Sequence, residues 1–161
     1  MLVPKRVLFS SVLAVGAAGA LLFSVGASAG EGSRLLSATL APSLPTDPAF
    51  HGVTAGGAPW VLNRGEVSIR DNGKFELEVD GLVIPALGTP DGVKTISASL
   101  YCGADANAAP AATTKQVPLS SEGDATIRET LTLPATCLAP IVLVHPNGIA
   151  KRYISVSGWR N

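Results

Sequence analysis

The sequence predicts an all-β protein: an antiparallel β-sandwich of immunoglobulin-like architecture, with eight or nine short strands that follow a cleaved leader. Apolar and polar residues alternate with a period of two in several short runs, and turn signals recur about every ten residues. No segment after the leader has the pattern of an amphipathic helix. A β-barrel is the alternative. Because Trp60 precedes both cysteines, the Cys-Trp-Cys spacing of true immunoglobulin domains is missing.

Residues 1–29 are typical of a secretory signal peptide. Two basic residues open it, an apolar run covers residues 7–25, and the small residues Ala27 and Ala29 mark a cleavage site before Gly30. An uncleaved membrane anchor is the alternative, since the run approaches the ~20 residues that span a bilayer. Glycines and serines dilute the run, so we expect cleavage, export by the general secretory route and a mature protein that is not held in a membrane.

The remaining residues are close in number to the ~100–150 of a typical single domain. We expect residues 30–60 to form a short strand plus a Pro/Gly-rich arm of that domain, and residues 61–161 to form the β-sandwich body. The chain has 12 basic and 12 acidic residues, and the charges are scattered. A basic stripe for nucleic acid is absent, so no nucleic-acid partner is expected.

Eight or nine short strands are expected in the mature chain, at residues 35–40, 66–70, 74–80 with a continuation at 82–84 that Pro85 stops, 95–102, 116–119, 125–133, 141–144 and 153–156. Prolines and a Gly-Gly pair between residues 41 and 60 predict an extended arm across the domain. Residues 103–114 are rich in alanine, but Gly103, Asn107 and Pro110 favour a surface loop over a helix.

The turn Asp71-Asn72-Gly73 allows a sharper prediction, because loop length fixes the register of a hairpin. A two-residue loop would set Ile69 opposite Glu76 and mix apolar with polar side chains on both faces. A three-residue loop sets Ile69 opposite Phe75 and Val67 opposite Leu77, which keeps one face apolar. We therefore predict the three-residue loop, with Gly73 in the left-handed region.

Other strands carry simpler expectations. In residues 95–102 the even-numbered side chains are expected to face the core, Cys102 included, and the odd-numbered ones to face outward. Glu129 interrupts the inward row of residues 125–133, which favours an edge position over a buried acid that needs a partner. For the hairpin signal Pro146-Asn147-Gly148, neither candidate register separates apolar from polar side chains onto opposite faces, and the register stays open.

Cys102 and Cys137 are the only cysteines. In an oxidising compartment such a pair usually forms a disulfide. The chain-entropy model gives about 3–4 kcal/mol of stabilisation for a ring of this length. Redox and zinc chemistry are the alternatives, but the C-x-x-C spacing is absent and only two histidines are available to complete a metal site.

No motif predicts catalysis or a cofactor. The chain lacks a G-x-S-x-G elbow, and solvated imidazoles are expected for His51, in the proline-rich arm, and for His145, beside a turn. The Asp105-Ala106-Asn107 run starts like a calcium loop but lacks the next ligand and the turn glycine. Four carboxylates are expected on the outward face of the hairpin, where a solvated surface is favoured over a cleft: Glu66, Glu76, Glu78 and Asp80. We predict no catalytic, cofactor-binding or metal-binding residue.

Four aromatic residues could form a binding platform for sugar, but core packing or pinning of the arm is the favoured interpretation: Trp60, Tyr101, Tyr153 and Trp159. Several segments resemble a group of small exported bacterial proteins of unassigned function, namely residues 58–62, 79–85, 100–102, 123–125 and 133–137. The segments are turns, core residues and the cysteine pair. The resemblance therefore implies a shared β fold and carries no functional residue.

Taken together, these observations favour an exported, non-catalytic β-sandwich protein with a binding or structural role at or beyond the cell surface. Its partner would be an envelope or extracellular protein or glycan. The alternative is a small-ligand or carbohydrate-binding module that uses loops at one end of the sandwich, such as residues 103–114 with nearby aromatic rings. The sequence identifies neither the ligand nor the oligomeric state.

Overall fold

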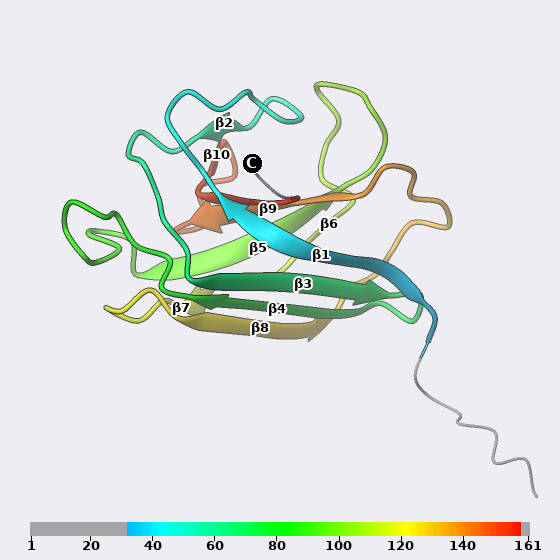
Figure 1. Cartoon of the computed structure of the whole chain (residues 1–161). Helices are drawn as coiled ribbons and strands as arrows, with labels where there is room; N and C mark the ends of the chain where they lie inside the picture. The colour runs from blue at the N-terminus through cyan, green and yellow to red at the C-terminus, as the bar shows by residue number, and fades with distance from the viewer. Residues whose placement is uncertain (1–31, 159–161) are drawn as a thin grey trace, which may run out of the picture.

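The computed structural model describes residues 32–158. The expected signal peptide and Trp159 lie outside the described residues. Within that range the chain is all-β and contains no helix (Figure 1). No helix long and apolar enough to cross a membrane is found in the described part of the chain.

Residues 32–158 form eleven strands: β1 (Arg34–Pro42), β2 (Thr54–Ala55), β3 (Arg64–Arg70), β4 (Lys74–Asp80), β5 (Thr95–Tyr101), β6 (Ala112–Thr113), β7 (Val117–Pro118), β8 (Ala125–Thr130), β9 (Ile141–Pro146), β10 (Arg152–Tyr153) and β11 (Ser155–Ser157). All but β2 and β10 belong to one sheet, in the order β6-β5-β9-β11-β1-β3-β4-β8, with β7 also on β5. Every strand pair in this sheet is antiparallel. β2 and β10 form a separate parallel pair.

The sheet curls so that its two halves share one hydrophobic core. In Figure 1, β3, β4 and β8 lie below β5 and β9, and β1 crosses between the two levels. The main core takes buried side chains from both halves, such as Phe75 and Leu77 of β4, and Ile96 of β5 with Val144 of β9. The alternation read in the sequence therefore fills a single interior.

The predicted register of the β3–β4 hairpin is confirmed. Ile69 lies opposite Phe75 and Val67 opposite Leu77, and all four side chains are buried. Gly73 has a φ of 83° and its N–H donates to the carbonyl oxygen of Arg70 at 2.9 Å. Burial of one apolar face thus selected the three-residue loop.

Two strand predictions and one loop prediction were wrong in extent. Residues 82–84 form only isolated bridges, Val61 with Val83 and Ile84 with Thr89, because Gly81 turns the chain at a φ of 68°. The predicted loop 103–114 ends in β6, which pairs with β5. The strand expected at 125–133 stops at Thr130. Leu131 and Leu133 are nevertheless partly buried against the core.

The C-terminal hairpin left open by the sequence has a wide connection. Leu143 of β9 pairs with Val156 of β11, and Val144 pairs with Ser155. Between these strands the chain forms β10, which leaves the sheet to pair with β2. The tight loop around Asn147 is therefore only the first part of the connection. This explains why no register of a simple two-strand hairpin separated apolar from polar side chains.

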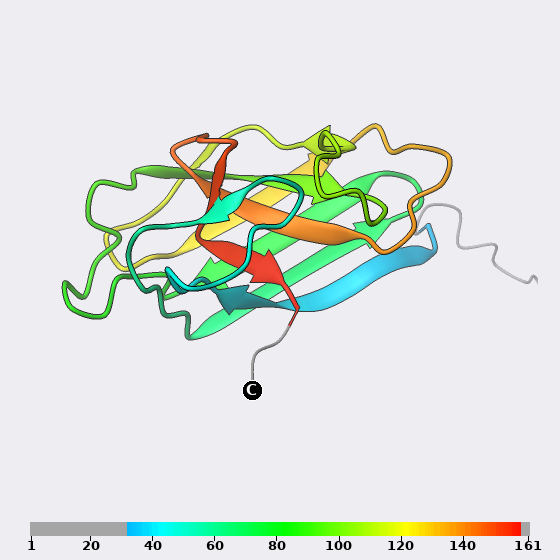
Figure 2. The same cartoon turned by 90° about the horizontal axis from the view of Figure 1, so that it is seen from above.

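The outward assignment of the odd-numbered residues of β5 was wrong. Ser97, Ser99 and Tyr101 are all buried, at 4%, 2% and 2% exposure. The reason is that the arm between β1 and β3 lies over β9 and β11 on the side away from the main core (Figure 2). A second apolar cluster fills this space: Ala41, Val53, Tyr101, Leu143, Tyr153 and Val156.

Glu129 lies at the edge of the sheet, as predicted, since β8 pairs only with β4. Its half-buried carboxylate also has a partner, because Oε1 accepts a hydrogen bond from the backbone N–H of Lys115 at 2.9 Å. This contact joins β8 to the segment between β6 and β7, at the opposite edge of the curled sheet. A side chain thus replaces a ladder hydrogen bond where the two edges meet.

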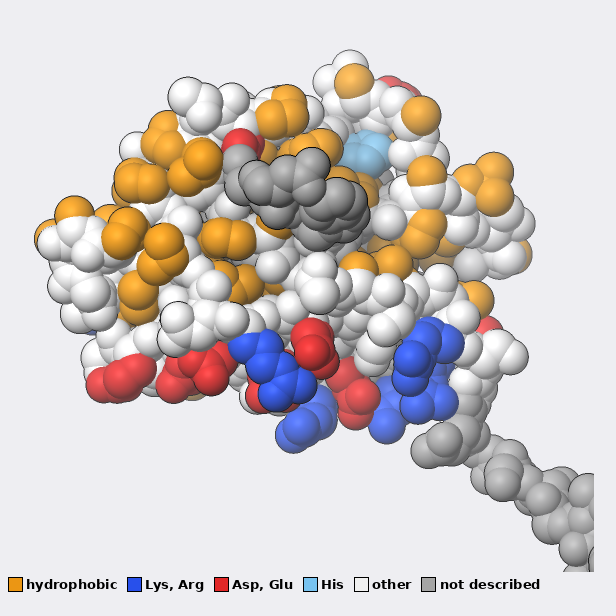
Figure 3. All heavy atoms as spheres, in the orientation of Figure 1, with side chains coloured by type: hydrophobic (Ala, Val, Ile, Leu, Met, Phe, Trp, Pro, Cys, Tyr) orange, Lys and Arg blue, Asp and Glu red, His pale blue; other side chains and the backbone are white. Residues whose placement is uncertain are grey.

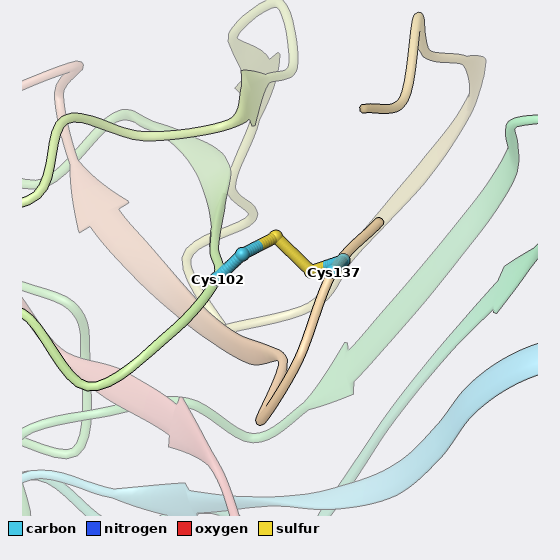
Figure 4. The surroundings of a disulfide bond; sticks show 2 residues. All are labelled: Cys102 and Cys137. Atoms are coloured by element: carbon cyan, nitrogen blue, oxygen red, sulfur yellow. A yellow bond between two sulfur atoms is a disulfide. The ribbon is translucent and has the colours of Figure 1, made fainter. Parts of the chain in front are cut away.

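The predicted disulfide is present. Cys102, just after β5, is bonded to Cys137 in the segment before β9, with their Cα atoms 5.0 Å apart (Figure 4). Both cysteines pack against the main core. The N–H of Gly103 also donates to the carbonyl oxygen of Leu138 at 2.6 Å. The disulfide therefore ties the long 131–140 segment to the end of β5.

Candidate functional site

The two outer faces of the curled sheet differ in what covers them. The arm caps the outer face of β5, β9 and β11, and two contacts of Tyr153 hold it there. The Tyr153 hydroxyl donates to the carbonyl oxygen of Pro48 at 2.8 Å, and its ring lies 5.6 Å from the ring of Phe50. Among residues 32–158, no segment covers the outer face of β1, β3, β4 and β8 in the same way, and we call it the open face of the sheet (Figure 1).

The aromatic residues do not form a platform in the described part of the chain. Trp60, Tyr101 and Tyr153 are buried, in agreement with core packing and arm pinning, while Trp159 lies outside the described range. The Tyr101 ring stacks on His51 with centroids 4.9 Å apart. Burial raises the pKa of Tyr101 above its usual value of 10.0. The ring therefore stays neutral and serves as packing.

His51 fixes the arm to the loop after β5. Its Nδ1 lies 2.7 Å from the carbonyl oxygen of Asp105, and its ring covers one face of Tyr101. The expectation of a freely solvated imidazole is therefore only partly right, since His51 is half-buried. Asp105 also accepts a hydrogen bond from the N–H of Asn107 at 2.9 Å, which closes a local turn in the run that resembled a calcium loop.

His145 is buried, at 1% exposure, so its assignment as a solvated residue was wrong. β9 continues through this position, and β10 packs beside it. Nδ1 lies 2.7 Å from the carbonyl oxygen of Arg152, and Nε2 has no partner. Burial lowers the pKa of His145 below 6.5. The imidazole is therefore neutral at physiological pH.

Ser97 lies opposite His145 across β5 and β9. A serine beside a neutral imidazole is the minimal arrangement for nucleophilic catalysis, which also requires access to substrate. Both side chains are buried, and neither lines any of the hollows described below. The pair therefore offers no reacting atom to solvent.

The open face carries a hollow of about 480 Å³. Charged side chains gather on this side of the molecule, over β3, β4 and β8, whereas the upper part of the same view is richer in apolar groups (Figure 3). The outward-pointing residues that line the hollow come from four strands: Ser37, Thr39, Glu66, Ser68, Glu76, Glu78, Thr126 and Arg128. We call this hollow the polar groove.

Ion pairs order the side chains of the polar groove. Glu76 lies 3.2 Å from Lys74 Nζ and 4.0 Å from Arg128 Nε. Glu66 lies 3.3 Å from Arg64, and its hydrogen bonds and charge raise the pKa of the Arg64 guanidinium above its ordinary value. Such exposed pairs are each worth only about 0–1 kcal/mol. They therefore arrange donors and acceptors on the face more than they stabilise the fold.

Two carboxylates in the groove repel each other when no ligand is bound. Glu66 lies directly opposite Glu78 on neighbouring strands, and like charges in this position repel. Arg64 is close enough to both carboxylates to offset part of that repulsion. Hydroxyl groups of Thr39 and Thr126 flank the two acids in the same row across the sheet. The groove thus offers carboxylates, hydroxyls and guanidinium groups to a polar ligand.

Metal binding finds no support in the part of the chain that the structure describes. No group of three or more His, Cys, Asp or Glu side chains there could hold a metal ion. Glu129 lines neither the polar groove nor the apolar pocket described below, and neither histidine does. The residues at which the sequence suggested possible chemistry are therefore spread over separate parts of the fold.

Sequence reasoning placed the groove carboxylates on an outward face, which the structure confirms for Glu66, Glu76 and Glu78. It did not find the groove itself. The strands that line it are β1, β3, β4 and β8, and the pairing of β1 with β3 and of β4 with β8 joins segments far apart in sequence. The alternation of Ser37 and Thr39 in β1 was the available signal.

Comparisons with family models, with curated proteins and with solved structures gave no match. The resemblance to small exported bacterial proteins therefore stays a prediction.

Proposed function

We propose that this protein is an exported, non-catalytic β-sandwich protein that binds a partner at or beyond the cell surface, and that the polar groove is its binding surface. The difference between the two outer faces carries the proposal. The arm buries one face completely enough to create a second core, whereas the other face stays open and hollow. The arm covers one outer face of the sheet and leaves the other outer face open, so the open face is available to a partner.

Export is supported by the leader pattern of residues 1–29, with cleavage at Ala29. The Cys102–Cys137 disulfide is compatible with the oxidising environment that an exported protein meets. The sandwich interpretation is supported by a core that takes side chains from both halves of the curled sheet. A non-catalytic role is supported by the burial of Ser97 and His145.

The chemistry of the groove points to a polar partner, an envelope or extracellular protein or glycan. Carboxylates and guanidinium groups bind charged groups of a protein, and the flanking hydroxyls extend the pattern of donors and acceptors to sugar hydroxyls. The contacts would be exposed and charged, so binding would weaken with salt over the range in which the Debye length falls below about 10 Å.

Affinity capture tests this proposal. The exported protein is immobilised and exposed to the envelope fraction and culture fluid of the producing cell, beside a variant in which Glu66, Glu76 and Glu78 are all changed to Gln. A matched control carries Asp91→Asn, Glu122→Gln and Asp124→Asn, three similar changes away from the groove. Enrichment of one polymer or protein by the wild type and the control, but not by the groove variant, supports the proposal. Equal enrichment by all three overturns the role of the groove, and no enrichment overturns a binding role.

A second candidate function is small-ligand binding at one end of the sandwich. The observation that favours it is an apolar pocket of about 170 Å³ at the disulfide end, close to where the 103–114 loop leaves β5. Because Trp60, Tyr101 and Tyr153 are buried, stacking of a sugar on these rings has no support there. The small-ligand form of this function is therefore favoured over the carbohydrate form.

A further inference from the structure

We propose that the apolar pocket at the disulfide end binds the end of a straight hydrocarbon chain, about six carbon atoms deep. This inference rests on the second candidate function, small-ligand binding, and is independent of the polar groove. Every residue that lines the pocket is apolar: Leu35, Leu36, Ile69, Leu100, Leu133, Pro134, Ala135, Cys137 and Pro140. Such a lining offers a ligand hydrophobic contact and no side-chain hydrogen bond or charge.

The pocket runs from the surface into the main core. Ile69 and Leu100 form its inner wall and are 1% and 3% exposed, as members of the core itself. Leu35 at the mouth is 54% exposed, and Leu138, next to the lining residue Cys137, is 72% exposed. Both belong to the small set of large hydrophobic residues that are exposed in the described part of the chain, and Leu138 is the most exposed of that set. A chain that entered the pocket would cover apolar surface both inside and at the rim.

A β-bulge builds the mouth of the pocket. β1 pairs Arg34 with Arg70 and then Leu36 with Ile69, so Leu35 is an extra residue on the β1 side. In a regular strand, neighbouring side chains point to opposite faces. Here both Leu35 and Leu36 line the same pocket. Bulges re-aim side chains in this way and are common beside binding and active sites.

The opposite wall of the pocket is fixed in place. Cys137 is bonded to Cys102 at the end of β5, and the N–H of Gly103 bonds the carbonyl oxygen of Leu138 at 2.6 Å. Pro134 and Pro140, at either end of this segment, restrict its backbone further. A wall held by a disulfide and prolines cannot easily collapse onto the core. The pocket is therefore preformed, and little ordering is needed when a ligand binds.

The volume of the pocket limits how many carbon atoms of the hydrocarbon chain it can hold. A cavity of about 150 Å³ lined by leucine, isoleucine and phenylalanine is large enough for benzene, which has six carbons. The present pocket has a similar volume of about 170 Å³ and an open mouth. An open mouth lets a longer molecule keep its remaining atoms outside, which suits the end of a chain. The chain could belong to a membrane lipid or to a soluble amphiphile, since both present the same hydrocarbon.

The test is a titration of the exported protein with straight-chain alcohols from butanol to decanol, followed by the NMR signals of leucine and isoleucine methyl groups. Each buried methylene is expected to raise the affinity about fourfold, because it contributes about 0.8 kcal/mol. The rise should continue to about six carbons and then flatten. Shifts should centre on Leu36, Ile69 and Leu100. A second titration, with phosphatidylcholine vesicles, tests whether the hydrocarbon chain can come from a membrane lipid; binding of the alcohols without binding of the vesicles points to a soluble amphiphile.

Ala135→Phe places a ring in the mouth of the pocket, and Ala86→Phe makes the same change at an exposed position that does not line it. The first should weaken the binding of octanol by on the order of tenfold or more, the loss expected when two methylenes lose contact, and the second should not. Thermal unfolding of both variants checks that they fold. Unchanged octanol binding by Ala135→Phe overturns the inference, as does a wild type that binds none of the alcohols. In the latter case, shifts of the same methyl signals by small polar fragments would leave the small-ligand function standing and remove only the hydrocarbon assignment.

Discussion

Replacing Gly73 with alanine tests whether the β3–β4 hairpin is held as described. Gly73 has a φ of 83°, and alanine in this left-handed region costs about 1–2 kcal/mol. The stiffer unfolded chain offsets roughly 0.4–1 kcal/mol of that cost. A Cβ atom would also contact the carbonyl oxygen of Leu131, a backbone atom that must move. That movement strains the 2.9 Å bond from the N–H of Leu131 to the oxygen of Gly73, worth about 0.5–1.5 kcal/mol.

Gly88→Ala is the matched control. Gly88 also has a positive φ, 67°, but a Cβ atom there would meet nothing within 4 Å. We expect Gly88→Ala to lower the free energy of unfolding by about 1 kcal/mol and Gly73→Ala by about 1.5–2.5 kcal/mol. Urea unfolding, monitored by circular dichroism, measures both values at equal m. Equal losses in the two variants would refute the close approach of the hairpin loop to Leu131.

Three further predictions concern other contacts. Removal of the disulfide, with Cys102 and Cys137 both changed to Ala, should lower the free energy of unfolding by about 3–4 kcal/mol in urea, and a loss below 1 kcal/mol would contradict the ring-closure argument. Glu129→Ala should cost about 1 kcal/mol because it leaves the N–H of Lys115 unpaired, whereas Glu129→Gln, which keeps an acceptor oxygen, should cost less; equal losses would count against the bond. Because the folded pKa of His145 is depressed, the unfolded chain binds more protons below pH 6.5, so stability is full above that pH and falls as the pH drops, by at most about 1.4 kcal/mol per unit. Unfolding measured from pH 7.5 to 5 should show this slope in the wild type and a flatter one in His145→Gln.

The sequence pattern was sufficient to predict the structure where a strand buries only one of its two faces. The β3–β4 hairpin is the clearest case, because only one loop length buries Val67, Ile69, Phe75 and Leu77 together. The disulfide followed from cysteine number and the expected compartment, with Cys102 placed on the inward face by alternation. The hairpin prediction depends on contacts between two neighbouring strands, which sequence periodicity records, whereas the disulfide prediction needed only a single possible pair of cysteines.

Prediction failed where a second layer covers the sheet. Ser97 and Ser99 are small and polar, so period-two reasoning placed them in solvent, yet both are buried. His145 is buried as well, and β10, in the connection that follows β9, packs beside it. Nothing in the spacing of these residues records that the arm and the β2–β10 pair lie on the outer side of this half of the sheet. The signal available was the arm itself, whose Phe50 and Val53 needed an apolar surface to cover.

The two candidate binding sites are also beyond sequence reasoning, but for different reasons. The polar groove needs the non-local pairing of β1 with β3, whereas the apolar pocket needs a bulge at Leu35 and a segment tied down by the disulfide. A bulge has no fixed sequence signal when its extra residue is another leucine. Only the pairing of Leu36 with Ile69, one residue out of step with Arg34 and Arg70, reveals it.

The alternation of β3 also makes the two sites separable by experiment. Ser68 lines the polar groove on the outer face, and the next residue, Ile69, lines the apolar pocket on the inner face. Ser37 and Leu36 of β1 have the same relation. Since neighbouring side chains point to opposite faces of the sheet, a change of a groove carboxylate leaves the pocket wall untouched. Loss of partner capture in the groove variant and loss of octanol binding in Ala135→Phe are therefore independent outcomes, and a single change that removed both would point to unfolding and not to binding.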